Sequence, residues 1–145
     1  MEVEKGSILK RILLTGGSGF IGSALVKILK KKNKILIVSR KKKKSSNKNL
    51  MYLKHDLSKS KISKLKFNPH MIIHLAGKTL NTNKKYTSYK KVNENLTANL
   101  LSSVNSDLEK IIFFSTQYVY GNPDSVKINE NNQLDPTFSP YSKSK

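Results

Sequence analysis

Tyr141 and Lys145 stand four residues apart in the segment SPYSKSK and could together transfer a proton. On a helix, residues at positions i and i+4 share a face, so the two side chains would be neighbours. A phenol with a pKa of about 10 is a poor base near neutral pH, and an ammonium group beside it favours the phenolate. The same spacing arises by chance in a chain with 28 basic residues, and the alternative is a basic tail.

A glycine-rich stretch, TGGSGFIG at residues 15–22, is the second candidate for chemistry. Glycines permit a tight turn and let a pyrophosphate approach the backbone amides at a helix N-terminus. Two glycine templates overlap here. Gly17, Gly19 and Gly22 match G-x-G-x-x-G, while Gly16, Gly19 and Gly22 match G-x-x-G-x-x-G. Between an apolar strand and an amphipathic helix, such a stretch predicts a dinucleotide-binding site, whereas a purely structural turn is the alternative.

The strands that must position these residues are predicted by short Ile- and Leu-rich runs. Such runs are typical of strands buried on both faces of a parallel sheet. We expect strands over residues 10–15, 34–39, 50–56, 70–77 and 110–116. We expect helices over residues 20–31, 58–65 and 86–104, and a last helix that begins after Ser139. The alternation predicts an α/β fold with a doubly wound parallel sheet, in which ligands bind at the carboxyl ends of the strands.

Local sequence gives further detail for the helices and loops. In the helix over 20–31, one face at i, i+4, i+7 and i+8 spacing would carry Ile21, Leu25, Ile28 and Leu29. Ser139 is the expected N-cap of the last helix, with Pro140 in its first turn. Two polar segments are expected to be loops, residues 40–49 with five consecutive basic residues and residues 121–138 with a turn at GNPD.

Composition excludes some classes of protein. The formal net charge of +19 suggests nucleic-acid binding, but only Arg11 and Arg40 are arginines and the lysines are spread along the chain, so this function is the least favoured. The absence of cysteine excludes disulfides and thiolate metal sites and fits a cytoplasmic location. No run approaches the roughly 20 apolar residues of a membrane span. We interpret residues 1–9 as an N-terminal lead-in and residues 10–145 as one domain.

The stretch TGGSGFIG resembles the short-chain dehydrogenase/reductase superfamily, in particular its extended branch of NAD(P)-dependent nucleotide-sugar epimerases and dehydratases. Four further motifs fit that branch in the right order: HDL at 55–57, HLAG at 74–77, VNENLTANLL at 92–101 and STQYVYG at 115–121. Glu94 and Leu96 depart from the third pattern. The resemblance implies a Rossmann-type sheet, truncated after about five strands and without the substrate domain, because family members continue for at least as long again.

The resemblance also implies a set of cofactor-binding residues. These are Gly16, Gly19, Phe20, Ile21, Gly22, Arg40, Asp56, Leu57, Leu75, Ala76, Gly77, Asn93, Tyr141 and Lys145. After the second strand the family carries an acidic residue for NAD or a basic one for NADP, so Ser39 and Arg40 slightly favour NADP, with a solvated basic loop as the alternative. His74 is expected to be a packed strand residue rather than a metal ligand, and no metal is expected.

By the same resemblance, Thr116 supplies the catalytic hydroxyl, Tyr141 is the acid/base and Lys145 also holds the nicotinamide ribose. Dehydratases of the family carry Asp-Glu after that threonine, whereas this chain has Gln117 and Tyr118, which favours an epimerase or a ketosugar reductase. We expect a fragment that is inactive alone, with Tyr141 and Lys145 poorly held. Its completed form would bind a nucleotide sugar and could form a dimer. The alternative is a non-catalytic dinucleotide-binding module.

Overall fold

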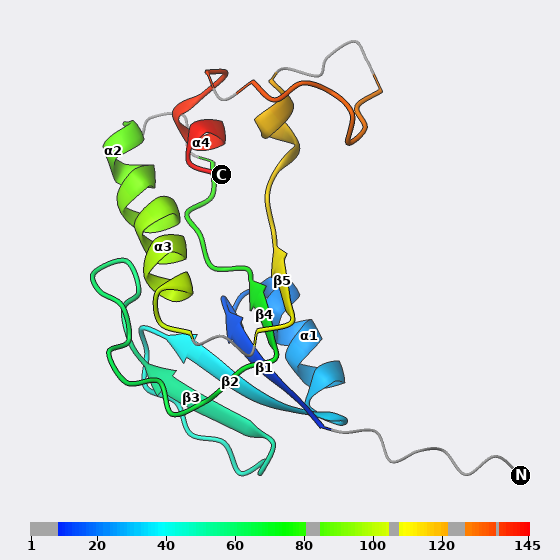
Figure 1. The fold of residues 1–145 in the computed structure, drawn as a ribbon, viewed down its shortest axis with the longest axis vertical. Helices are drawn as coiled ribbons and strands as arrows, with labels where there is room; N and C mark the ends of the chain where they lie inside the picture. Colours follow the sequence, from blue (N-terminus) through cyan, green and yellow to red (C-terminus); the bar gives the residue numbers. More distant parts are fainter. Residues whose placement is uncertain (1–8, 81–84, 105–107, 122–126, 136) are drawn as a thin grey trace, which may run out of the picture.

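Five parallel strands form one sheet in a computed structural model that describes residues 9–80, 85–104, 108–121, 127–135 and 137–145. The strands are β1 (Lys10–Thr15), β2 (Asn33–Ser39), β3 (Leu50–Lys54), β4 (Met71–His74) and β5 (Lys110–Phe113). Their order is β3-β2-β1-β4-β5, so the chain winds outward from β1 in both directions (Figure 1). The predicted doubly wound α/β sheet is confirmed.

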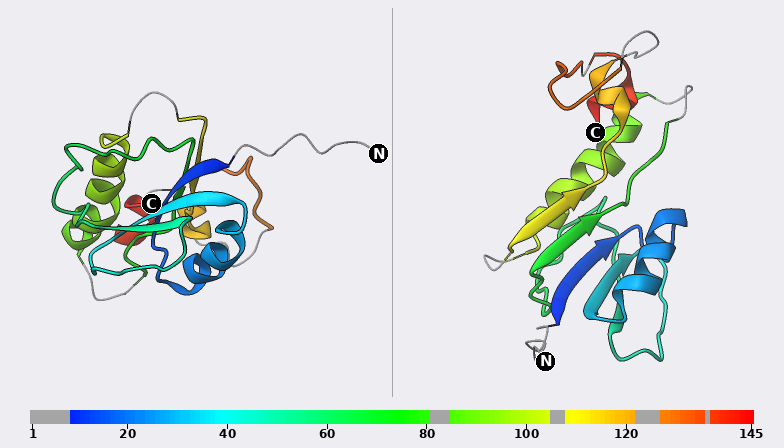
Figure 2. Two further views of the ribbon diagram at one scale, coloured as in Figure 1. Left: turned by 90° about the horizontal axis from the view of Figure 1, so that it is seen from below. Right: turned by 90° about the vertical axis from the view of Figure 1, so that its right-hand side faces the viewer.

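Helices cover both faces of this sheet (Figure 2). On one face lies α1 (Phe20–Leu29). On the other face, α2 (Tyr86–Tyr89) continues through a π-helical segment (Lys90–Glu94) into α3 (Asn95–Leu101). The short helix α4 (Pro140–Lys143) lies beyond the carboxyl ends of the strands, beside α2 (Figure 1). Such a two-sided cover explains why the strand sequences are apolar without alternation.

The core has two parts, because successive side chains of a strand point to opposite faces of the sheet. Ile12 and Leu14 of β1 belong to the cluster that contains Val26 of α1. Leu13 lies between them in sequence and belongs to the cluster that contains Leu100 of α3. All three β1 side chains are at most 2% exposed, so the strand that leads into the glycine loop is anchored from both sides.

The face of α1 differs from the predicted one. Leu25 and Leu29 pack against the core together with Val26, but Ile21 is 50% exposed and Ile28 is 66% exposed. Gly22 is buried on the inner face, and the close approach of the helix to the glycine loop there turns the packed stripe toward Gly22 and Val26.

The helix expected over residues 58–65 is not formed; that segment consists of turns and irregular chain. Asp56 Oδ1 accepts hydrogen bonds from the backbone N–H and the hydroxyl of Ser58, and the N–H of Ile62 donates to Ser103 Oγ. The N–H of Ile62 would be needed inside a helix over 58–65, so its bond to Ser103 competes with that helix. The N–H of Ser58 would lie in the first turn, where a helix leaves it without a partner.

The helix over 86–104 is confirmed, apart from its π-helical segment and its end at Leu101. The other strands and helices lie where they were expected, with ends that differ by a few residues. Residues 1–8 of the predicted N-terminal lead-in (1–9) and most of the GNPD turn lie outside the described residues. Within the described part of the chain, no helix is both long and apolar enough to cross a membrane.

Candidate dinucleotide-binding site

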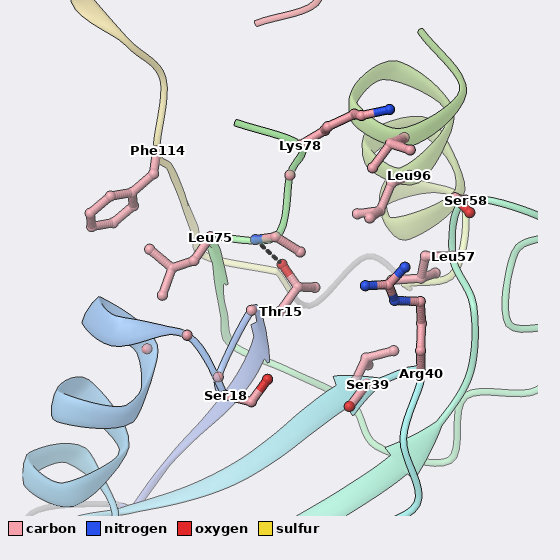
Figure 3. A pocket seen from close by; sticks show the side chains of 18 of the residues that line it. Thr15, Ser18, Ser39, Arg40, Leu57, Ser58, Leu75, Lys78, Leu96 and Phe114 are labelled. Atoms are coloured by element: carbon pink, nitrogen blue, oxygen red, sulfur yellow. Dashed lines mark hydrogen bonds between the residues drawn. The ribbon is translucent and has the colours of Figure 1, made fainter. Parts of the chain in front are cut away.

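A cavity of about 860 Å³ opens at the carboxyl ends of the strands (Figure 3). Its walls come from the loops after β1, β2, β3 and β4, from the helix that contains Val92 and Leu96, and from α4. The predicted cofactor residues that line it are Gly16, Gly19, Phe20, Ile21, Gly22, Arg40, Asp56, Leu57, Leu75, Ala76, Gly77, Tyr141 and Lys145. Sequence motifs scattered from residue 16 to residue 145 therefore meet around one space.

The glycine loop turns tightly between β1 and α1. Gly16 has φ +73°, a left-handed conformation that favours glycine, and a Cβ there would lie 2.8 Å from the backbone nitrogen of Ala76. At Gly22 a Cβ would lie 2.2 Å from the carbonyl oxygen of Gly16, so the helix can approach the loop only without a side chain. At Gly19 an added Cβ would lie 3.3 Å from Gly16 O, a tight contact but a milder one than at Gly16 or Gly22, and Gly19 lines the cavity.

The part of the cavity at the end of β2 carries a positive charge. The side chain of Arg40 extends from the end of β2 into the space near Leu57 (Figure 3). Asp56 lines the same space, but its Oδ1 accepts both hydrogen bonds from Ser58. These bonds are the main cause that lowers the pKa of the Asp56 carboxyl, with smaller contributions from Lys59 and Arg40.

The N-terminal cap of α4 helps to position Tyr141 and Lys145 at the cavity. The Oγ of Ser139 accepts a hydrogen bond from the N–H of Ser142 at 3.0 Å, and the N–H of Ser139 donates to Ser142 Oγ at 2.9 Å. This reciprocal pair is a capping box, and Pro140 occupies the first turn. The predicted N-cap at Ser139 is confirmed.

Tertiary contacts hold α4 in place despite its four residues. The ring of Tyr141 packs against the buried ring of Tyr89, with centroids 5.7 Å apart. Asn93 Nδ2 donates to Ser144 Oγ at 2.8 Å, and Lys145 Nζ donates to the carbonyl oxygen of Phe114 at 2.8 Å. The expectation of a poorly held Tyr-Lys pair is therefore wrong, because side-chain contacts replace the stability that a short helix lacks.

The environment of Lys145 is apolar as well as polar. Its ammonium lies 5.0 Å from the ring centre of Phe113, and burial lowers the pKa of the Lys145 amine. Lys145 lines the same cavity as Tyr141, and its role toward a ligand stays a prediction.

Thr116 lies outside this cavity, on a second one of about 640 Å³. Ser115 and Lys145 line both cavities, so the two spaces adjoin at these residues. Thr116 also caps a short 3-10 turn, Gln117–Tyr120, where its side chain accepts a hydrogen bond from the N–H of Tyr118 at 3.4 Å.

Asn93, expected among the cofactor-binding residues, is not among the side chains that line the cavity. It is 4% exposed, and its Oδ1 accepts from the N–H of Lys78 at 2.6 Å while its Nδ2 holds Ser144. Its position in the π-helical segment turns it toward these partners. Asn93 therefore supports the walls of the site.

Sequence reasoning missed two residues that hold the site, Tyr89 and Ser144. Tyr89 belongs to no quoted motif, and Ser144 lies in SPYSKSK without an assigned role; their contacts join segments that are about 50 residues apart. The amphipathic pattern of the helix over 86–104 was the one signal that could have pointed to Tyr89. Among the described residues, no group of three or more His, Asp or Glu side chains could hold a metal ion.

Comparison with known proteins decides the family. The family model described as "NAD dependent epimerase/dehydratase family" matches residues 12–145. The chain belongs to this family. It is 29% identical to UDP-glucose 4-epimerase from Neisseria meningitidis serogroup C, over 94% of this chain and 45% of that protein. It is 33% identical to dTDP-D-glucose 4,6-dehydratase from Dictyostelium discoideum, over 94% of this chain and 38% of that protein.

A solved structure supports the fold of the site. The UDP-glucuronic acid 4-epimerase from Bacillus cereus, in complex with NAD, matches with a TM-score of 0.77 and 27% identity, over 93% of this chain and 48% of that chain. The chain thus spans about half the length, or less, of these family members. An epimerase and a dehydratase are both among them, so family membership alone leaves the reaction open.

Proposed function

We propose that this chain is the dinucleotide-binding part of a nucleotide-sugar epimerase or reductase, and that the whole protein moves hydride at a sugar carbon. The observation that carries the proposal is the single cavity in which the glycine loop, Arg40, Tyr141 and Lys145 meet. Its glycine loop suits a pyrophosphate, since Gly19 lines the space at the start of α1 and the added Cβ contacts at Gly16 and Gly22 are closer than the 3.3 Å contact at Gly19.

A bound nicotinamide dinucleotide supplies the hydride acceptor or donor. The chain's own residues manage the proton and the geometry. As a sugar carbinol loses hydride from carbon, Tyr141 takes the hydroxyl proton, and it returns that proton when the carbonyl is reduced. Lys145 holds a ribose hydroxyl. Thr116 donates a hydrogen bond to the sugar oxygen from the second cavity, where charge develops during the reaction.

Gln117 and Tyr118 favour epimerisation or simple reduction over dehydration. Elimination of water from a ketosugar needs an acid and a base besides the Tyr-Lys pair. Of the two residues after Thr116, Gln117 carries no ionisable group and Tyr118 packs its ring against Phe138 at 5.7 Å and Tyr141 at 6.5 Å. We also propose that the full-length enzyme is cytoplasmic and forms a dimer. A non-catalytic dinucleotide-binding module remains the second candidate because the chain spans about half of its relatives.

Calorimetric titration of the chain with NADH and with NADPH tests the proposal. We expect both to bind, with NADPH favoured because the Arg40 guanidinium can pair with a 2′-phosphate. Arg40→Ala should weaken NADPH about tenfold, the order of one charge-assisted hydrogen bond, and leave NADH nearly unchanged. Lys42→Ala is the matched control, because it removes an equal charge from the exposed part of the same loop.

Absence of affinity for either dinucleotide would contradict the proposal. Equal effects of Arg40→Ala and Lys42→Ala would show that general charge, rather than Arg40, selects the cofactor. Turnover of UDP-sugars or dTDP-sugars by the isolated chain would show that no further segment is required. Binding without turnover, even after a relative's remaining half is supplied, would favour the non-catalytic module.

A further inference from the structure

His74 is a buried polar residue that the reaction does not use. It lies at the carboxyl end of β4, where it is level with Thr15 of β1 and Phe113 of β5, and it is 2% exposed. Its side chain is not among those that line the cavity. Nevertheless both ring nitrogens are engaged, Nδ1 with Thr15 Oγ1 at 2.6 Å and Nε2 with Thr97 Oγ1 at 2.9 Å.

The partners decide which nitrogen carries the proton. Thr97 Oγ1 donates its single hydrogen to the carbonyl oxygen of Asn93 at 2.7 Å, so toward His74 it can only accept. Nε2 must therefore be protonated, and Nδ1 is left as an acceptor for the hydroxyl of Thr15. That hydroxyl oxygen in turn accepts from the N–H of Ala76 at 3.1 Å (Figure 3). Every donor in the chain of bonds then has one acceptor.

We propose that His74 is a positioning residue: as the neutral Nε2–H tautomer, it joins the start of the glycine loop at Thr15 to the helix at Thr97, and so sets the distance between two walls of the cavity. The inference deepens the proposed function and rests on it for the identity of the ligand. The tautomer itself does not depend on that ligand.

One end of this connection, Thr15, lies at the cavity wall, and the other end, Thr97, lies next to a residue that does. Thr15 precedes Gly16 and, through the N–H of Ala76, ties the loop after β1 to the loop after β4; all three residues line the cavity. On the other side, Leu96 is next to Thr97 in sequence and lines the cavity from the helix (Figure 3). A shift of the helix relative to β1 would change the width of the cleft.

The surroundings of His74 keep the ring neutral near pH 7. Burial lowers the pKa of His74 from 6.5 to about 4, and the Lys145 cation acts in the same direction. The ring of Phe113 lies 5.5 Å away on the β5 side, while Thr15 and Thr97 are uncharged. A neutral imidazole can donate at one nitrogen and accept at the other, whereas a protonated one could only donate and would lose the bond from Thr15.

The tautomer can be read directly by ¹⁵N-detected correlation of imidazole nitrogens with ring protons. The chain has three histidines, His55, His70 and His74, so spectra of the single variants His55→Gln and His70→Gln assign the third. At pH 7 we expect His74 with a protonated Nε2 and an unprotonated Nδ1. The Nδ1–H tautomer or an imidazolium at pH 7 would overturn the proposal.

The positioning role is tested through Thr97, which does not line the cavity. Thr97→Val removes the acceptor for Nε2–H at nearly constant shape, and Thr97→Ser is the matched control that keeps the hydroxyl. We expect Thr97→Val to weaken NADH or NADPH binding roughly fivefold, the order of one neutral hydrogen bond, and Thr97→Ser to retain affinity. Binding is measured where thermal unfolding shows each variant to be fully folded.

A purely structural role would give a different result. The folded Thr97→Val protein would then bind the dinucleotide as tightly as the unsubstituted chain, which would overturn the proposal. The amide resonances of Gly16 and Ala76 provide a readout without ligand: we expect them to move in Thr97→Val and not in Thr97→Ser. If no dinucleotide binds to the unsubstituted chain, the proposed function fails, and these amides and the tautomer still decide the role of His74.

Discussion

The glycines of the loop have different structural roles, although all of them are simply glycine in the motif. A Cβ at Gly22 would meet backbone at 2.2 Å, whereas a Cβ at Gly19 would meet one backbone atom at 3.3 Å. Backbone cannot move aside as the end of a flexible side chain can. Gly22 is thus required by the fold of the protein alone. At Gly19 we expect the missing side chain to leave room for a ligand.

We therefore predict opposite outcomes for two alanine variants. Gly22→Ala should lower the free energy of unfolding by several kcal/mol, of the order of a strong overpacking clash, or prevent folding. Gly19→Ala should unfold within about 1 kcal/mol of the unsubstituted chain but lose most of its dinucleotide affinity. Thermal unfolding and calorimetric titration measure the two effects. A Gly19→Ala protein that binds as well as the unsubstituted chain would show that no ligand approaches this amide.

At the scale of elements, α4 is short, yet it positions Tyr141 and Lys145 at the cavity. Its capping box is local and was readable from the sequence, because Ser139, Pro140 and Ser142 lie within one turn. Its packing against Tyr89 and Asn93 is not local. The π-helical segment that contains Asn93 turns this side chain toward Ser144, and nothing in residues 90–94 indicated a π-helix.

The cap of α4 can be tested by Ser139→Ala. Loss of the Ser139 hydroxyl leaves the N–H of Ser142 without its acceptor, which should cost about 1 kcal/mol of stability. Amide hydrogen exchange at Ser142 should accelerate, and dinucleotide affinity should fall because Tyr141 and Lys145 follow the cap. Ser139→Asp keeps an acceptor at this position and should restore both, whereas the exposed Ser63→Ala should change neither. Unchanged exchange in Ser139→Ala would contradict a capping role.

At the scale of the whole molecule, the sheet ends in an uncovered apolar strand. β5 is the last strand in the order, and its side chains Ile111, Ile112 and Phe113 are 47%, 38% and 39% exposed. Since neighbouring side chains of a strand point to opposite faces, both faces of β5 are open. Exposed apolar edges of this kind are where further chain packs or where proteins associate. The feature accords with a chain that spans about half of its relatives.

The pH dependence of stability is also a property of the whole chain. The pKa of His74 falls from 6.5 to about 4 on folding, chiefly through burial, so the unfolded chain binds a proton that the folded chain does not. This contribution is fully present above pH 6.5 and is lost as the pH falls toward 4. The pKa values of Asp56 and Asp135 are also lowered, mainly by hydrogen bonds from Ser58 and Thr137, and their contributions are lost below about pH 3.8.

We predict a loss of stability in two stages on acidification. The first, between pH 6.5 and 4, should amount to roughly 3 kcal/mol, since one pKa unit corresponds to about 1.4 kcal/mol. Denaturant unfolding at a series of pH values measures it. His74→Gln should remove this stage and leave the acid stage below pH 3.8. Equal slopes for both proteins between pH 6.5 and 4 would show that His74 does not cause the effect.

The sequence by itself determined the α/β class, the strand centres, the dinucleotide loop and the cap of α4. Each of these follows from residues that are close together in the chain: apolar runs, glycines at the strand-to-helix turn, and a serine before a proline. The same local rules mispredicted the helix over 58–65, because Ser103 competes there for the N–H of Ile62.

Only the tertiary structure decided how these pieces support one another. The bonds of His74 to Thr15 and Thr97, the contact of Tyr89 with Tyr141, and the bond of Asn93 to Ser144 each join residues between 23 and 59 positions apart. Such contacts depend on strand order and on the side of the sheet to which each helix returns. Local sequence predicts the residues of the site. Long-range packing determines which of them line the cavity and which hold the others in place.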